Sequence, residues 1–173
     1  MKTWLYIGRF QPFHNGHKLV VDTMLWEVDT AIICIWLSQW EEKNPYDYNT
    51  RLHFFTHLYP NVVHIHFFPL ADLESDRDWI QSILELPYIS VSQELTLYCG
   101  DIKNDSAVKV IQAHRDMFEW MTLEIREISR DKIPVSWTEI RQDIASGNFD
   151  NTQGKIPDEV WEILKNWVPR IDF

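Results

Sequence analysis

Near its start the chain carries the ten residues Gly8-Arg9-Phe10-Gln11-Pro12-Phe13-His14-Asn15-Gly16-His17. A short apolar run at 4–7 precedes them, and an apolar-periodic segment at 19–28 follows. This order predicts a strand, a tight loop and a helix that begins beside two histidines. The first turn of a helix has unpaired N–H groups and a partial positive charge, so it suits a phosphate. The imidazoles can donate hydrogen bonds there, and Gly16 has no Cβ to keep a ligand away, so we expect this loop to hold a nucleoside triphosphate.

Length and composition predict one domain over residues 1–173, with 45% hydrophobic and 24% charged residues, as in ordinary globular proteins. No apolar run approaches the ~20 residues that cross a bilayer. The first residues also lack the pattern of a signal peptide. Cys34 and Cys99 fall in predicted strands and are expected to be free thiols. We therefore expect a cytoplasmic protein without a membrane partner.

The net charge of −10 argues against a nucleic-acid partner, because such proteins usually present a basic face. An acidic protein that binds anionic substrates must gather its few cations locally. Several fall in or beside loops at predicted strand ends, namely Arg9, Lys18, Lys43, Arg51 and Arg141. Nine tryptophans are an unusual number, and they suit either the core or the contacts of a homo-oligomer.

Apolar runs and helical patterns alternate along the chain. Strands are predicted at 2–8, 30–37, 61–68, 95–99 and 122–128, and helices at 16–27, 49–59, 76–86, 106–114, 138–145 and 157–167. This rhythm predicts an α/β fold: a Rossmann-like, doubly wound parallel sheet of about five strands with helices on both faces, plus C-terminal helices. Ligands of such sheets bind at the carboxyl ends of the strands, where the loop at 8–17 falls. The long loop at 38–47 is expected to be functional.

A second candidate site is Ser136-Trp137-Thr138-Glu139-Ile140-Arg141. Ser136 or Thr138 can cap the helix that follows, which would place hydroxyl groups, backbone N–H groups and Arg141 around one anion. In isolation, a plain helix cap with a surface arginine is the simpler interpretation. The presence of the first loop in the same chain favours the anion site.

The dinucleotide fingerprint G-x-G-x-x-G and the Walker A loop are both absent, which leaves the H-x-G-H motif of His14 to His17. Together with the 136–141 segment, this motif resembles the nucleotidyltransferase superfamily that has an H-x-G-H signature. The similarity is greatest to the nicotinamide mononucleotide adenylyltransferases, especially the compact archaeal type and the adenylyltransferase half of bacterial Nudix fusions. Further matching segments are Asn44-Pro45-Tyr46 with Arg51, Leu70-Ala71-Asp72 with Asp78-Trp79-Ile80, and Tyr98-Cys99-Gly100-Asp101.

The chain departs from this family at three places. Trp137 stands where a small residue is usual, Asn49-Thr50 replaces an acidic residue before the arginine, and Asp101 stands where asparagine is frequent. These departures affect the expected substrate detail more than the expected reaction class.

The resemblance implies an enzyme that joins ATP and nicotinamide mononucleotide to give NAD and pyrophosphate. It implies that His14 and His17 contact the ATP phosphates, with His17 nearest the α-phosphate, and that Arg141 grips the leaving phosphates. The other residues expected to bind ATP or its phosphates are Gly8, Arg9, Phe10, Gly16, Ser136, Thr138 and Arg51. Mg²⁺ is the expected cofactor, held by ATP and water rather than by a dedicated protein site.

The mononucleotide is expected to contact Trp79, whose indole can stack on the pyridinium ring, and Asn44. Spacing alone does not distinguish this role from a structural one, in which Trp79 packs its helix against the sheet.

Other interpretations remain open. The reaction could be adenylyl or cytidylyl transfer to another phosphate acceptor, such as FMN or phosphopantetheine, or the chain could sense nucleotides without turnover. Four histidines at 53, 57, 64 and 66 pair on one helical face and one strand face, but no cysteine or carboxylate completes a metal site, so we expect no protein-held metal.

Overall fold

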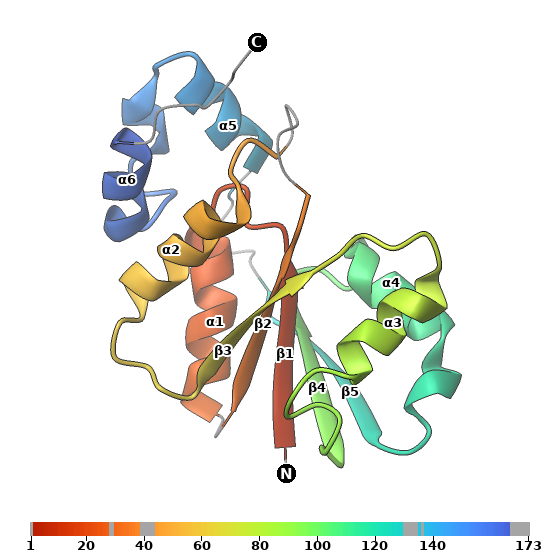
Figure 1. Cartoon of the computed structure of the whole chain (residues 1–173). Coiled ribbons are helices and arrows are strands. Elements are labelled where there is room, and N and C mark those ends of the chain that lie inside the picture. Colours follow the sequence, from red (N-terminus) through yellow and green to blue (C-terminus); the bar gives the residue numbers. More distant parts are fainter. Residues whose placement is uncertain (1, 28–29, 39–43, 130–134, 136, 167–173) are drawn as a thin grey trace.

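A computed structural model of the chain describes residues 2–27, 30–38, 44–129, 135 and 137–166. Its five strands form one parallel sheet in the order β3-β2-β1-β4-β5 (Figure 1). The strands are β1 (Lys2–Gly8), β2 (Ala31–Trp36), β3 (Ile65–Leu70), β4 (Glu94–Cys99) and β5 (Thr122–Glu127). The α-helices are α1 (Asn15–Glu27), α2 (Tyr48–Leu58), α3 (Asp76–Leu84), α4 (Ser106–Ala113), α5 (Trp137–Ala145) and α6 (Asp158–Lys165).

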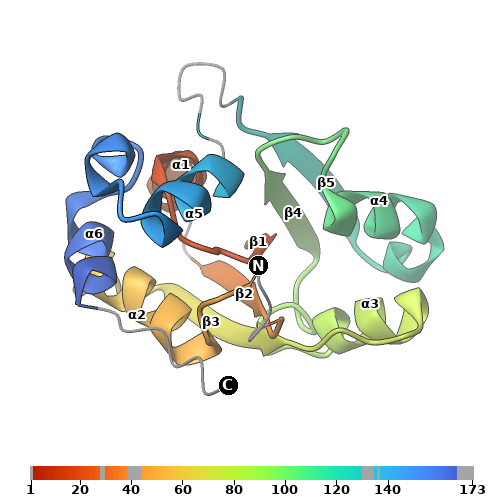
Figure 2. The same ribbon diagram turned by 90° about the horizontal axis from the view of Figure 1, so that it is seen from above.

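Helices cover both faces of the sheet. Helices α1 and α2 lie on one face, and α3 and α4 lie on the other (Figure 1). The chain first adds β2 and β3 on one side of the central strand β1, and then adds β4 and β5 on the other side. The strand order therefore reverses beside β1. The sheet is seen from above in Figure 2. Crevices at such reversals are the usual ligand sites of doubly wound folds, and the loop at 8–14 begins there. The predicted fold class is confirmed.

Side chains of β1 alternate between two cores, as the period of a strand requires. Trp4 and Tyr6 pack with the α1, α2 and α6 side, whereas Leu5 and Ile7 pack with the α3 and α4 side. Strands buried on both faces need an almost continuous apolar sequence, which explains the runs that mark β1 and β2.

The third strand begins later than the sequence predicts. The predicted range was 61–68, whereas β3 spans Ile65–Leu70 and turns occupy the residues before it. A proline is usually excluded from a strand, but Pro69 lies in β3, which is the edge strand next to β2. Two short 3₁₀ helices, at 115–118 and 149–152, were also not predicted.

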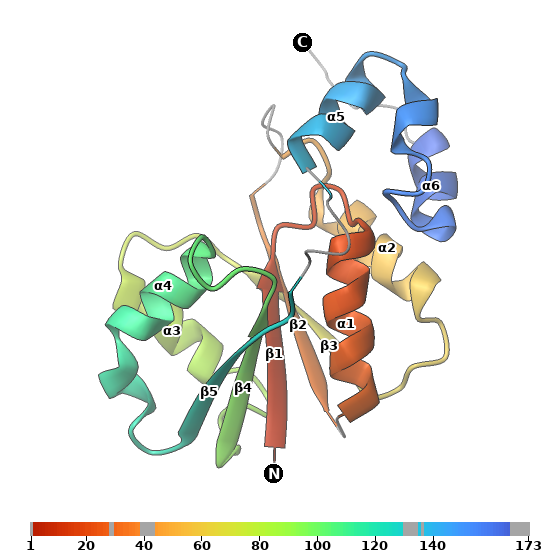
Figure 3. The ribbon, with the colours of Figure 1, turned by 180° about the vertical axis from the view of Figure 1, so that it is seen from behind.

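The C-terminal helices lie beyond the carboxyl ends of the strands, on the same side as α1 and α2 (Figure 3). Asn15, the first residue of α1, holds this region: its backbone N–H donates to the Lys155 carbonyl oxygen at 2.9 Å, and its side chain donates to the Gly154 carbonyl oxygen at 2.7 Å. The predicted helices at 138–145 and 157–167 are confirmed within the described part of the chain, although Trp167 lies outside it.

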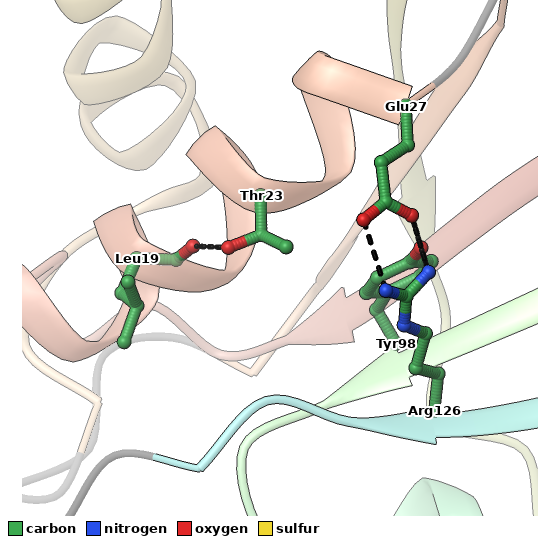
Figure 4. Close-up of polar contacts among 5 residues, drawn as sticks. All are labelled: Leu19, Thr23, Glu27, Tyr98 and Arg126. Carbon is green, nitrogen blue, oxygen red and sulfur yellow. Dashed lines mark hydrogen bonds and ion pairs between the residues drawn. The ribbon is translucent and has the colours of Figure 1, made fainter.

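The other end of α1 is tied to the sheet through Glu27. Its carboxylate accepts two hydrogen bonds from the Arg126 guanidinium of β5 and one from the Tyr98 hydroxyl of β4, the latter at 3.1 Å (Figure 4). The helix that carries the histidine motif is therefore fixed at both ends. Within the described residues no helix is long and apolar enough to cross a membrane.

Candidate active site

The loop between β1 and α1 is shaped by Gly8 and Phe10. Phe10 adopts a positive φ of 51°, which turns its ring back over the end of β1 and buries it. A Cβ built on Gly8 would lie 2.6 Å from the Cζ of Phe10, so only glycine leaves room for the ring. The ring then packs edge-on against Phe55 and His17, with centroids 4.8 and 5.0 Å apart. Gly8 and Phe10 therefore shape the loop.

His14 and His17 are held by backbone groups of the first helical turn. The Nδ1 atom of His14 accepts hydrogen bonds from the N–H groups of Gly16 at 3.1 Å and His17 at 3.3 Å. The Nδ1 atom of His17 accepts from the His14 N–H at 3.3 Å. An accepting Nδ1 carries no proton, so each neutral ring has its N–H at Nε2 and presents it as a donor.

Gln11 joins this loop to the segment between β2 and α2. Its side-chain nitrogen donates to the Tyr46 carbonyl oxygen at 2.7 Å, and its side-chain oxygen accepts from the Tyr46 N–H at 2.9 Å. Burial raises the pKa of Tyr46, and the positive charge of Arg141 opposes that rise. The Gln11–Tyr46 hydrogen bonds thus join the two loops.

Arg51 lies fully buried beneath both loops. Its guanidinium donates to the carbonyl oxygens of Asp47 at 3.1 Å and Arg9 at 2.9 Å, and also to that of Trp36. Burial lowers its pKa to about 10, while the nearby Asp47 acts in the opposite direction. Its Nη2 atom has no hydrogen-bond partner among the described residues. Arg51 therefore fixes loop carbonyls, and direct contact with a phosphate stays a prediction.

A half-open cavity of about 360 Å³ lies at the carboxyl edge of the sheet. Six predicted site residues line it: Gly8, Arg9, Phe10, His17, Asn44 and Arg141. The cavity thus unites the histidine loop with the Arg141 helix, two segments more than 100 residues apart in sequence. An acidic chain has here gathered two arginines and a histidine around one space.

The remaining predicted residues that the structure describes lie outside the cavity lining. His14 is buried and its ring stacks on that of His17, while Gly16 is buried within α1. Thr138 is exposed on α5 but does not line the cavity, and Ser136 lies outside the described residues. Their roles at the phosphates stay predictions.

Trp79 also lies outside the cavity lining. It is 3% exposed, and its indole stacks on that of Trp36 with ring centroids 5.4 Å apart. Among the tryptophans that the structure describes, Trp36, the last residue of β2, lines the cavity. The stacking of Trp79 on a pyridine ring stays a prediction, because its ring is buried under Trp36.

Part of the cavity lining was not predicted from the sequence. Gln11 and Trp36 line it, as do residues 104–107 at the start of α4. Asp105 caps α4, since its side chain accepts from the Val108 N–H at 3.1 Å. A signal for this region was available, because β4–loop–α4 repeats the strand–loop–helix order of the first loop at the same sheet edge.

The donor set indicates how a divalent cation could be held. Among the described residues, no three histidine, cysteine or carboxylate side chains cluster as metal ligands. Asp105, an acidic residue of the cavity lining, uses one carboxylate oxygen to cap α4. The described residues therefore fit a cation that arrives with a phosphate ligand better than one held by a protein cage.

The chain is similar in sequence and in fold to known proteins. The nicotinamide-nucleotide adenylyltransferase of Halobacterium salinarum is 28% identical over 169 residues, covering 95% of this chain and 86% of that protein. A crystal structure of a bifunctional NMN adenylyltransferase/ADP ribose pyrophosphatase from Francisella tularensis superposes with a TM-score of 0.66 at 19% identity, covering 84% of this chain and 42% of that one. Another structure of that bifunctional protein, complexed with AMP and a manganese ion, gives 0.61 at 16% identity, with coverages of 91% and 43%.

This chain thus spans less than half of the bifunctional protein, and the superpositions at such identities establish the fold alone. The family evidence comes from a sequence model described as cytidylyltransferase-like, which matches residues 5–143. That range extends from β1 into α5 and includes both segments that meet at the cavity. The chain belongs to the cytidylyltransferase-like family.

Proposed function

We propose that the protein is a nicotinamide-nucleotide adenylyltransferase, which joins ATP and nicotinamide mononucleotide to give NAD and pyrophosphate. The observation that carries this proposal is the convergence of Arg9, His17 and Arg141 on one cavity at the carboxyl edge of the sheet. The named function of the Halobacterium salinarum relative, which aligns over 95% of this chain, supports the choice of substrates.

The reaction is a displacement at the α-phosphorus of ATP. A 5′-phosphate oxygen of the mononucleotide attacks that phosphorus and forms a new P–O bond. The bond from the α-phosphorus to the bridging oxygen breaks, and its electron pair leaves with pyrophosphate. The attacking phosphate monoester has a second pKa of about 6, so it is already largely dianionic at neutral pH. The protein therefore needs no general base, and it acts by positioning and by stabilising charge.

His17 is suited to the α-phosphate. Its Nδ1 accepts from the His14 N–H, which orients the ring with its Nε2–H as the donor. A fixed N–H donor stabilises the charge that builds on the phosphate oxygens more effectively than water, because it does not have to reorient. His14 caps the first turn of α1 and supports the His17 ring from its stacked position.

Arg9 and Arg141 would bind the remaining phosphate oxygens. Planar guanidinium groups form paired hydrogen bonds with phosphate, so Arg141 suits the departing pyrophosphate. ATP would enter as its complex with a divalent cation, which we expect to be Mg²⁺, coordinated by phosphate oxygens and water. Asn44 would contact the mononucleotide from the wall of the same cavity.

The proposal is tested by incubating the purified chain with ATP, Mg²⁺ and a panel of acceptors, and by measuring released pyrophosphate. The panel contains nicotinamide mononucleotide, its deaminated form, FMN and phosphopantetheine. We expect turnover with a pyridine mononucleotide and NAD or its deaminated form as the second product. Turnover with FMN or phosphopantetheine alone would reassign the acceptor. ATP binding without pyrophosphate release from any acceptor would make the chain a nucleotide sensor.

A further inference from the structure

Three side chains form a layered stack at the carboxyl end of β2. Trp79 of α3 is the buried layer, Trp36 is the middle layer, and Arg9 of the first loop is the exposed layer. The two indoles have an interplanar angle of 26°, and the Cζ of Arg9 lies 5.7 Å from the Trp36 ring centroid. Since Trp36 and Arg9 both line the cavity, the stack leads from the hydrophobic core to the phosphate-binding space.

The backbones of the two outer layers are fixed by one group. The buried Arg51 guanidinium donates to the carbonyl oxygens of both Arg9 and Trp36. Arg9 and Trp36 are therefore coupled twice, through the cation–π contact of their side chains and through a shared donor beneath their backbones. These two contacts together hold the Arg9 guanidinium close to the Trp36 ring.

An exposed arginine would otherwise be poorly placed for binding. None of the ion pairs among the described residues involves Arg9, so no carboxylate there orients its guanidinium. A long side chain loses conformational entropy when it binds a ligand, and restricting it beforehand reduces that loss. A guanidinium that lies over an aromatic ring uses its face and leaves its N–H groups, which lie in its plane, available for phosphate oxygens.

We propose that Trp36 is a positioning residue that holds the Arg9 guanidinium toward the phosphates of ATP, with Trp79 as its buried support. This inference rests on the proposed function in that it takes ATP as the anion that Arg9 meets. It assigns to Trp36 a role in phosphate binding and not in stacking on the pyridine ring. Trp36 acts through Arg9, so removing Arg9 should abolish its effect.

A double-mutant cycle on ATP affinity tests this coupling. The dissociation constant for ATP with Mg²⁺ is measured by calorimetry for the wild type, Arg9→Ala, Trp36→Ala and the double variant. We expect Trp36→Ala to weaken ATP binding roughly three- to tenfold, as the loss of a cation–π contact would. In the Arg9→Ala background, the same change should alter the constant by less than about twofold. Trp36→Phe, which keeps an aromatic face, should recover part of the affinity.

Two controls accompany the cycle. Trp26→Ala removes a tryptophan that is 89% exposed at the end of α1, and it should leave ATP affinity unchanged. Thermal unfolding checks that each variant is folded. Should Trp36→Ala fail to fold, Trp36→Leu replaces it in the cycle, because leucine keeps an apolar side chain but has no π face.

The outcomes separate this inference from the proposed function. Equal weakening of ATP binding by Trp36→Ala with and without Arg9 would overturn the positioning role. An unchanged ATP affinity with a raised KM for nicotinamide mononucleotide would also overturn it, and would assign Trp36 to the acceptor. Coupled ATP binding without NAD formation would support the positioning role while the proposed function fails. A wild type that does not bind ATP would refute both.

Discussion

His14 and His17 stack with their ring centroids 3.7 Å apart and their planes within 18°, and each accepts a backbone N–H from the other. The two rings thus form a reciprocal cap at the start of α1. One consequence is that the motif combines two functions: it satisfies N–H groups of the first helical turn and orients two Nε2 donors. The H-x-G-H spacing brings both rings to this turn.

The first prediction concerns His17, the histidine that lines the cavity. Replacing it with alanine removes a donor that we expect to act on the α-phosphate as charge builds there. Steady-state kinetics with ATP and nicotinamide mononucleotide should show kcat lowered by at least about tenfold with folding intact. His53→Ala, a change on the exposed side of α2, is the matched control and should keep the wild-type rate. Near-normal turnover of the His17 variant would exclude the assignment.

Much of the fold was predictable because local sequence and tertiary structure agree. The apolar runs of β1 and β2 match strands buried on both faces, and Asp47 caps α2 as its residue type suggests. The 136–141 segment and the histidine loop are expected from the sequence to serve one phosphate site, and Arg141 and His17 line the same cavity.

The side-chain layers of the site could not be predicted in the same way. Arg51 looks like a phosphate ligand in the sequence because it is a cation beside a loop, yet the structure buries it under carbonyl oxygens. Trp79 has the spacing of a stacking residue, but a second tryptophan, Trp36, covers it. The burial of Arg51 and the stacking of Trp36 on Trp79 depend on contacts between segments far apart in the sequence. The hydrophobic periodicity of each segment carries no information about such contacts.

The second prediction follows from the burial of Arg51. Arg51→Met removes the donor for the carbonyl oxygens of Arg9 and Trp36, which are partly buried, and leaves both without that partner. Each such loss costs about 1–3 kcal/mol, so urea unfolding should show a free energy of unfolding lower by roughly 2–6 kcal/mol. The control is Arg77→Met, because the side chain of Arg77 is 58% exposed and its ion pair with Asp116 should contribute under about 1 kcal/mol. Equal effects of the two changes would contradict a stabilising role for the hydrogen bonds from Arg51 to these carbonyl oxygens.

The third prediction distinguishes the two interpretations of Trp79. Because the ring is buried beneath Trp36, Trp79→Phe should keep an aromatic support there and change the KM for nicotinamide mononucleotide by less than about threefold. The smaller ring leaves a gap in the core, so thermal unfolding should show a lower midpoint, by some degrees, as for a loss of ~1–2 kcal/mol. A large rise in KM at an unchanged midpoint would instead support direct stacking of Trp79 on the pyridine ring.

The fourth prediction is a loss of stability in alkaline solution. Burial raises the pKa of the Cys34 thiol to about 12, and burial together with Asp22 raises that of the Tyr59 hydroxyl. In the unfolded chain these groups ionise at their ordinary values of about 8.5 for cysteine and 10 for tyrosine. Between those values and the raised ones, the unfolded state binds fewer protons than the folded state, so the free energy of unfolding falls as pH rises.

This stability is fully present below about pH 8 and is lost progressively at higher pH, with each group contributing up to ~1.4 kcal/mol per pH unit. Urea midpoints measured in steps between about pH 8 and pH 11 would record the decline. Tyr59→Phe removes one of the titrating groups, along with its 2.8 Å hydrogen bond to Asp22, and should therefore flatten the slope above about pH 10. The slope is the informative quantity, because the lost hydrogen bond lowers stability about equally at pH 8 and pH 9, where Tyr59 is protonated in both states. A variant with the wild-type slope would show that the Tyr59 hydroxyl ionises in the folded protein as easily as in the unfolded chain.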